Sequence, residues 1–209
     1  MTLQVKPHDL LWVNAVIDTD TVPEWFSIAD LLQRPVVVRR AVTTANHIAV
    51  GLRGYTRSQR YANVVAIDAV RRTMTPEQLV EQQGWYGRMT QNPLPHWQTL
   101  ATIAECMHTL GLTWGITGSL GFELATNIAT ANHQSDIDLR LCCPQAIDKS
   151  VGFSLMEQLN RLAQRPDIQI ETPTGAFAIN EWLSSSSSVL LKTARGPIIT
   201  ATPWADSCS

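Results

Sequence analysis

Residues 113–119 read Thr113-Trp114-Gly115-Ile116-Thr117-Gly118-Ser119, and residues 135–141 read Ser135-Asp136-Ile137-Asp138-Leu139-Arg140-Leu141. The first stretch predicts a short apolar strand followed by a Gly-Ser turn that opens a helix. The second predicts a strand whose alternation places the carboxylates of Asp136 and Asp138 on one face. Two such carboxylates repel each other unless a cation lies between them. Because Mg²⁺ binds a few carboxylate oxygens and leaves other positions to phosphate and water, the pattern predicts metal-dependent chemistry on a phosphate.

The Gly-Ser turn and a third carboxylate would complete such a site. Gly118 and Ser119 offer backbone N–H groups at a helix start, the helix dipole and one hydroxyl, which together suit a phosphate. A third carboxylate on a neighbouring strand would help to hold two metal ions. Glu171 is the first candidate, with Asp167 and Glu181 as alternatives, and an exposed position on an edge strand would explain Glu171 equally well.

The composition permits an enzyme of this kind and argues against two other classes of protein. The chain has 209 residues, 44% hydrophobic and 16% charged, so it can bury one good core or two small ones. Its net charge of -2 indicates no general attraction to nucleic acid. The N-terminal residues do not resemble a signal peptide, and no run of about eighteen apolar residues predicts a membrane span. We therefore expect a cytoplasmic protein that binds neither nucleic acid nor membrane.

Cysteine and histidine spacing indicates neither disulfides nor zinc. The four cysteines form no Cys-x-x-Cys pair, and the histidines form no His-x-x-x-His or His-Glu-x-x-His motif. We expect reduced, structural thiols, with the side chains of Cys142 and Cys143 pointing apart at the end of a strand.

Turn-forming residues between Gly84 and Pro95 indicate a boundary between an accessory domain, residues 1–84, and a catalytic domain, residues 93–209. Before it, apolar runs at 10–13, 36–38 and 48–52 predict strands, and Thr75 should cap a helix that ends at Gly84. After it, apolar residues at helical spacing predict helices over 100–110 and 153–162. Two further strands are expected at 168–171 and 176–179. The expected fold class is therefore α/β (α+β).

Basic residues are the remaining candidates for binding. A cluster of arginines in the first domain could cradle the phosphates of a donor or dock an acidic protein, because guanidinium groups pair with phosphate and carboxylate. Lys192 could neutralise phosphate, although a strand lysine reaching water explains it as well. The arginines are Arg39, Arg40, Arg53, Arg57 and Arg60.

The order of these motifs resembles the nucleotidyltransferase superfamily, whose pattern is an apolar strand, Gly-Ser, Asp-x-Asp and a later acidic residue on a strand. Over nearly its full length the chain is similar to the phosphoribosyl-dephospho-CoA transferase family, the holo-acyl-carrier-protein synthases of malonate decarboxylase. The segments that carry this resemblance are 34–40, 51–54, 118–123, 135–139, 171–177 and 181–182.

This resemblance implies a nucleotidyltransferase-like mixed sheet with covering helices and a smaller N-terminal α+β accessory domain. It also implies transfer of the phosphoribosyl-dephospho-CoA prosthetic group from 2'-(5''-triphosphoribosyl)-3'-dephospho-CoA to a serine of the malonate decarboxylase acyl-carrier subunit, with release of diphosphate. Asp136, Asp138 and Glu171 would bind Mg²⁺, and Gly118 and Ser119 would hold the triphosphate. The chain departs from the superfamily pattern in its long spacer before Asp136 and in having Glu171 where Asp is more usual.

Two other functions remain compatible with the motifs. The chain could be another metal-dependent nucleotidyltransferase that acts on a small-molecule hydroxyl, or a non-catalytic nucleotide-binding module. Loss of turnover on replacement of Asp136 and Asp138 would exclude the non-catalytic module, and the identity of the acceptor would separate the two enzymes.

Overall fold

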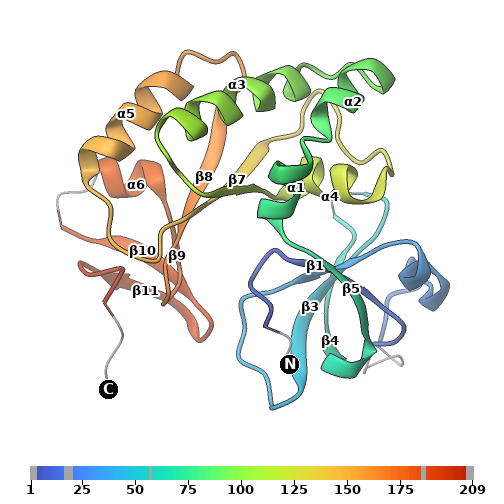
Figure 1. The fold of residues 1–209 in the computed structure, drawn as a ribbon. Helices are drawn as coiled ribbons and strands as arrows, with labels where there is room; N and C mark the ends of the chain where they lie inside the picture. The colour runs from blue at the N-terminus through green and yellow to red at the C-terminus, as the bar shows by residue number, and fades with distance from the viewer. Residues whose placement is uncertain (1–3, 17–20, 57, 185–186, 206–209) are drawn as a thin grey trace. The chain divides into compact units, whose positions relative to one another are not determined.

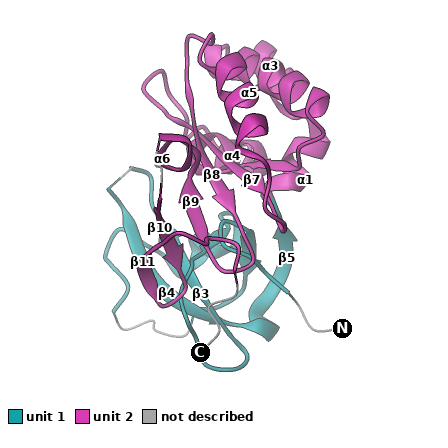
Figure 2. Ribbon diagram, turned by 90° about the vertical axis from the view of Figure 1, so that its left-hand side faces the viewer, with its two compact units in different colours: residues 1–75 teal, residues 76–209 magenta. Residues whose placement is uncertain are grey.

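The computed structural model describes residues 4–16, 21–56, 58–184 and 187–205. The chain divides into two compact units, Met1–Thr75 and Pro76–Ser209, coloured separately in Figure 2. Each unit has its own hydrophobic core. The division lies before the turn-rich segment 84–95, so this segment and the helix that precedes it lie in the second unit.

The first unit is a five-stranded antiparallel sheet with strand order β4-β3-β2-β1-β5. Among its described residues, the helical segments are two short 3-10 helices, η1 and η2. One face of the sheet packs around Leu11, Val36 and Val50, which are almost completely buried. The expected strands at 10–13, 36–38 and 48–52 are therefore confirmed. The elements are β1 Leu10–Val13, η1 Ile28–Leu32, β2 Val36–Val38, β3 His47–Arg53, β4 Arg60–Ala66, η2 Ile67–Ala69 and β5 Val70–Met74.

The second unit is built on a six-stranded mixed sheet with strand order β11-β10-β9-β8-β7-β6. The β7–β8 pair is parallel and the other neighbours are antiparallel. A parallel pair requires a crossover, which is supplied by α5 between the two strands. The helices are α1 Pro76–Gln82, α2 Trp85–Gln91, α3 Pro95–Thr109, α4 Gly118–Thr126, α5 Lys149–Leu159 and α6 Ile179–Ser184. The strands are β6 Trp114–Ile116, β7 Ile137–Cys142, β8 Pro166–Glu171, β9 Ala176–Ala178, β10 Val189–Thr193 and β11 Gly196–Thr200.

Helices cover the two faces of this sheet in different ways. In Figure 1, α3 and α5 lie along one face, where Ile137, Leu139 and Leu141 of β7 join their apolar side chains in the core. The shorter helices α1 and α4 contact β6 and β7 and each other. Because side chains alternate along a strand, Asp138 and Arg140 lie on the face opposite to the α3–α5 core. The sheet thus separates a largely apolar face from one that carries charged side chains.

Local signals placed the helices correctly but several of their ends only approximately. α3 begins at Pro95, five residues before the predicted range 100–110, and α5 spans Lys149–Leu159 where 153–162 was expected. α1 begins after Thr75 as expected, but Gln83, with φ 51°, takes the left-handed conformation that ends it. Gly84 instead has φ −58° and precedes a second short helix, α2, which we did not expect. Gly111 has φ 64°, as a glycine just beyond a helix end requires. The prediction for Gly84 was wrong because Gln83 adopts the left-handed conformation first.

The expected strands of the C-terminal half are present with shifted ends. β8 begins at Pro166, two residues before the predicted start, and Ile179 is the first residue of α6 rather than the last of a strand. A run of five serines occupies positions 184–188, and Ser185 and Ser186 lie outside the described residues. Within the described part of the chain, no helix is long and apolar enough to cross a membrane.

Candidate functional site

The Gly-Ser turn packs directly against the second aspartate. Gly118, at the first position of α4, has φ 65°, a conformation that side chains with a Cβ rarely adopt. A Cβ atom at Gly118 would lie 2.0 Å from Oδ2 of Asp138 and 2.9 Å from its Cγ, so only glycine fits there. The Thr117 backbone N–H donates to the Asp138 carbonyl oxygen at 2.9 Å, and its hydroxyl donates to the same oxygen at 3.2 Å. The Asp138 carboxylate is therefore held against the start of α4, where backbone N–H groups lack helical partners.

Of the candidate carboxylates, Asp136, Asp138 and Asp167 lie at the start of the parallel strand pair. Asp138 lies within β7 and is half-buried, whereas Asp136 is exposed and immediately precedes the strand. Asp167 of β8 is in register with Asp138, so the two residues are direct neighbours across the parallel pair. Glu171 is in register with Cys142, four residues further along, which corresponds to about 13 Å of strand. This register favours Asp167 over Glu171 as the third carboxylate and reverses the order in which the sequence ranked them.

Glu181, the other alternative, has a different position. It lies in α6, and its carboxylate accepts a hydrogen bond from the Leu190 backbone N–H at 2.8 Å. That bond ties α6 to the start of β10. Glu181 is thus engaged in joining two elements of the C-terminal half, away from β7.

The donor chemistry of the carboxylate face matches a hard cation. The side chains that could bind a metal there are carboxylates, and Mg²⁺ commonly uses one or two of them together with substrate phosphates and water. Within the described ranges, no group of three or more His, Cys, Asp or Glu side chains is arranged to hold a metal ion. Binding of Mg²⁺ by Asp136 and Asp138 therefore stays a prediction.

An ion pair that the sequence did not predict lies on the same face of β7. The Arg140 guanidinium is buried and donates to both carboxylate oxygens of Glu77 in α1, at 2.8 and 2.7 Å. The thiol of Cys142 donates to the same carboxylate at 3.0 Å. Burial acts to raise the pKa of Glu77, but the hydrogen bonds from Cys142 and Arg140 outweigh it and lower the pKa. The sequence did contain a signal for this ion pair, because Arg140 lies between two leucines of a buried strand. A buried arginine requires a partner of opposite charge.

The side chains of Cys142 and Cys143 point apart, as expected. Cys106, Cys142 and Cys143 form no disulfide among the described residues, and Cys208 lies outside them. Cys142 contacts Glu77 on one face, whereas Cys143 belongs to the apolar core on the other. Burial raises the pKa of Cys143 to about 11.

Three of the five candidate arginines share one face of the first unit's sheet. Arg53 and Arg60 are paired directly across β3 and β4. Arg39 lies along the same face, because its aliphatic stem passes over Gly51, two residues before Arg53 in β3. A Cβ atom at Gly51 would be 3.6 Å from Cδ of Arg39. Like charges placed directly opposite each other destabilise a sheet, so the pairing fits a face that binds anions. Arg40 immediately follows Arg39 and is half-buried, and Arg57 lies outside the described residues.

Lys192 lies on the carboxylate face of the second unit but not beside the aspartates. It is exposed on β10 and pairs with Ala176, which in turn pairs with Glu171. Directly opposed residues of paired strands share a face, so Lys192 is level with Glu171 and Cys142. It is therefore displaced along the sheet from Asp138.

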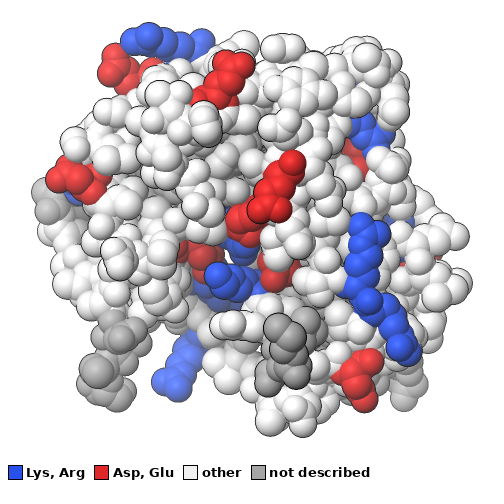
Figure 3. All heavy atoms as spheres, viewed as in Figure 1, with Lys and Arg blue, Asp and Glu red and all other residues white. Residues whose placement is uncertain are grey.

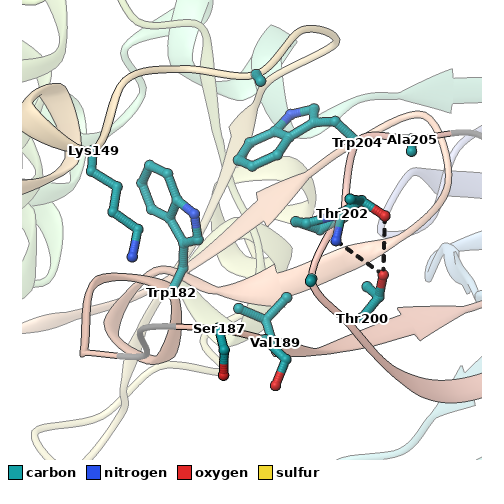
Figure 4. Close-up of a pocket in the computed structure, with 12 residues that line it drawn as sticks. Lys149, Trp182, Ser187, Val189, Thr200, Thr202, Trp204 and Ala205 are labelled. Atoms are coloured by element: carbon teal, nitrogen blue, oxygen red, sulfur yellow. Dashed lines mark hydrogen bonds between the residues drawn. The ribbon is translucent and has the colours of Figure 1, made fainter.

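A cavity of about 330 Å³ lies on the opposite face of this sheet (Figure 4). Trp182 and Trp204 line it, with their rings 5.7 Å apart, and both pack on Phe177. Phe177 is in register with Ile170, whose side chain belongs to the α3–α5 core. The cavity is thus separated from the carboxylates by the sheet.

The charge distribution matches a site that depends on a few specific groups. On the face drawn in Figure 3, most of the surface is uncharged, and Lys and Arg occur in small groups among Asp and Glu. An anion that binds on this face would therefore be held by local contacts rather than by a general field.

Family models match both parts of the chain. The model described as "Phosphoribosyl-dephospho-CoA transferase MdcG C-terminal domain" matches residues 84–203. The model described as "Phosphoribosyl-dephospho-CoA transferase MdcG N-terminal domain" matches residues 6–76. The second match ends close to the structural division between Thr75 and Pro76.

Curated relatives are similar over nearly the whole chain, and each is named phosphoribosyl-dephospho-CoA transferase. A relative from Klebsiella pneumoniae (strain 342) is 41% identical over 98% of both chains. One from Pseudomonas putida is 38% identical over 96% of this chain and 95% of its own. No solved structure shows a significant match. The chain is therefore a transferase and belongs to the phosphoribosyl-dephospho-CoA transferase family.

Proposed function

We propose that this protein transfers the phosphoribosyl-dephospho-CoA group from 2'-(5''-triphosphoribosyl)-3'-dephospho-CoA to a serine of the apo acyl-carrier subunit of malonate decarboxylase. The serine oxygen forms a bond to the phosphorus nearest the ribose. The bond from that phosphorus to the next phosphate oxygen breaks, and diphosphate leaves. The product carries its prosthetic group through a phosphodiester.

The observation that carries the proposal is the contact between Gly118 and Asp138. It holds the Asp138 carboxylate against the first turn of α4, so close that a Cβ atom at Gly118 would overlap Oδ2. A triphosphate binds where backbone N–H donors and a cation lie close together. The contact between Gly118 and Asp138 would place the N–H donors of α4 beside a carboxylate ligand for the cation. The family of the chain supplies the nature of the transferred group.

The residues around this contact take distinct roles. Asp136 and Asp138 would hold Mg²⁺, with Asp167 as the neighbouring carboxylate, and one of the aspartates would accept the serine proton. The N–H groups that follow Gly118, together with the Ser119 hydroxyl, would bind the phosphates of the leaving diphosphate. When bound, Mg²⁺ neutralises the negative charge that develops on the phosphate oxygens.

Basic side chains in each unit are further candidates for binding. In the first unit, Arg39, Arg53 and Arg60 share one face of the sheet and would bind anions, either the polyphosphate of the donor or acidic groups of the carrier subunit. Lys192 would meet the donor beyond the aspartates.

The direct test is the intact mass of the apo acyl-carrier subunit after incubation with this protein, Mg²⁺ and triphosphoribosyl-dephospho-CoA. The expected result is a mass gain equal to the phosphoribosyl-dephospho-CoA group. Asp138→Asn should abolish the gain. Glu157→Gln is the matched control, since Glu157 forms an exposed surface pair with Arg161 at 3.0 Å, and its loss should change nothing.

Two outcomes would contradict the proposal. Unmodified carrier, in the presence of verified donor and folded carrier, would move the search to small-molecule hydroxyl acceptors. A gain that persists in the folded Asp138→Asn variant would place the chemistry elsewhere on the protein.

A further inference from the structure

The segment 127–135 joins α4 to β7 and leads directly into the two aspartates. It contains no helix or strand, and such a segment would sample many conformations if it were not anchored. Asp136 follows it at the N-terminal end of β7. The position of the Asp136 carboxylate therefore depends on what holds this segment.

Glu123 of α4 anchors the middle of the segment. Its side chain is fully buried, and one carboxylate oxygen accepts hydrogen bonds from the backbone N–H groups of Thr130 and Ala131, both at 2.9 Å. The other oxygen lies 4.0 Å from the Arg88 guanidinium and 3.4 Å from the Asn92 amide nitrogen. A buried carboxylate is stable only when it is paired and hydrogen-bonded in this way.

A second contact ties the same point to the Gly-Ser turn. The Thr130 hydroxyl donates to the Ser119 carbonyl oxygen at 3.0 Å. The middle of the segment is thus held against both the side chain and the backbone of α4. The position of this part of the segment therefore depends on the position of the proposed phosphate-binding turn.

His96 anchors the end of the segment. It lies in α3 with an exposed fraction of 1%, and its Nε2 is 2.8 Å from the Ser135 carbonyl oxygen. A carbonyl oxygen only accepts, so Nε2 carries the proton and donates. The buried Nδ1 of the ring has no hydrogen-bond partner among the described residues. Because the Ser135 carbonyl belongs to the peptide bond that leads into Asp136, this contact fixes the peptide plane before the aspartate.

We propose, building on the function proposed above, that Glu123 and His96 are positioning residues that hold the segment 127–135 so that the Asp136 carboxylate lies beside that of Asp138. Neither residue contacts the reacting atoms in this role. Supporting residues of this kind typically contribute about 10- to 100-fold to metal affinity or activity.

His96→Phe is the main test, because it keeps a buried ring and removes the donor. We expect faster hydrogen exchange of the backbone amides in 127–136, about tenfold weaker binding of Mn²⁺ to the isolated protein, and about tenfold lower kcat with little change in KM for the carrier. His96→Gln should recover most of each loss, since its side-chain amide can donate to the Ser135 carbonyl. His108→Phe, an exposed position on the same helix, is the matched control and should leave all three unchanged.

Glu123→Gln gives an independent perturbation of the same segment. It removes the negative charge beside Arg88 and leaves one acceptor oxygen, so the amides of Thr130 and Ala131 should exchange faster and Mn²⁺ should bind more weakly. Thermal melting of every variant separates these effects from loss of the fold.

The readouts also separate this proposal from the proposed function. Faster exchange with unchanged Mn²⁺ affinity and unchanged kcat would show that the two residues only stabilise the fold, and unchanged exchange would refute the anchoring itself. If the unaltered protein binds Mn²⁺ but modifies no carrier, the proposed function fails, while exchange and Mn²⁺ binding still decide the roles of Glu123 and His96.

Discussion

Replacement of Gly118 by alanine should damage the proposed site more than the fold. The added Cβ would lie 2.0 Å from Asp138 Oδ2, 2.9 Å from its Cγ and 3.1 Å from its Cβ, so the carboxylate must move. The left-handed backbone at φ 65° adds a cost of about 1–2 kcal/mol for a residue with a side chain. A displacement of about 1 Å at a reacting centre can lower the rate about 100-fold. We therefore expect kcat/KM to fall at least about 100-fold, with a stability loss of about 1–2 kcal/mol from the backbone alone.

Gly87→Ala is the matched control for this substitution. Gly87 lies in α2, and a Cβ there would meet no atom within 4 Å. Alanine in a helix is favoured over glycine by about 0.5–1 kcal/mol, so this variant should be slightly stabilised and fully active. The assays are carrier modification followed by intact mass and thermal unfolding followed by circular dichroism. A Gly118→Ala variant with unchanged kcat/KM would refute the argument that the Gly118–Asp138 contact forms the site.

Three further predictions follow from the register, the buried ion pair and the buried thiol. Asp167→Asn should lower kcat/KM by about 10- to 100-fold and Glu171→Gln by much less, because only Asp167 is beside Asp138; equal effects in steady-state kinetics would contradict the register argument. Glu77→Gln should destabilise the fold by about 1–3 kcal/mol at neutral pH, since Arg140 loses a charged partner. The folded-state pKa of Glu77 lies below its ordinary value of 4.5, so this stabilisation is complete above pH 4.5 and is lost as the pH falls through the folded-state pKa. Urea unfolding from pH 7 to pH 3 should show the free energies of unfolding of the unaltered protein and of Glu77→Gln converge. A difference that stays constant over this pH range would count against the prediction. Cys143, with a pKa of about 11, should resist alkylation by iodoacetamide at pH 8 in the folded protein, and rapid labelling located by mass spectrometry would disprove its burial.

Most of the local structure follows from patterns that act over a few residues. Alternation along 137–141 separates Leu139 from Asp138, and the structure places them on opposite faces. Pro76 after Thr75 opens α1, and Gly111 closes the turn after α3, because proline and glycine restrict or permit particular backbone angles.

One helix end shows where such local signals fail. Gln83 takes the left-handed conformation that the sequence assigned to Gly84. A non-glycine residue pays a modest cost for that conformation, so packing of α2 on its neighbours can override the preference. Propensity therefore predicted that α1 ends near this point but not which residue ends it.

The sequence alone determined the Gly-Ser turn, the aspartate pair and the likeness of the whole chain to one family, since each is encoded by adjacent residues. Only the tertiary structure decided that Asp167, rather than Glu171, neighbours Asp138, that Glu77 pairs with Arg140, and that His96 holds the Ser135 carbonyl. These contacts join residues at least 29 positions apart. The crossover through α5 sets the register of β8 on β7. A shift of β8 along β7 would give Asp138 a different neighbour without altering any local sequence pattern. Such choices are made by packing of the shared core, which no short stretch of sequence records.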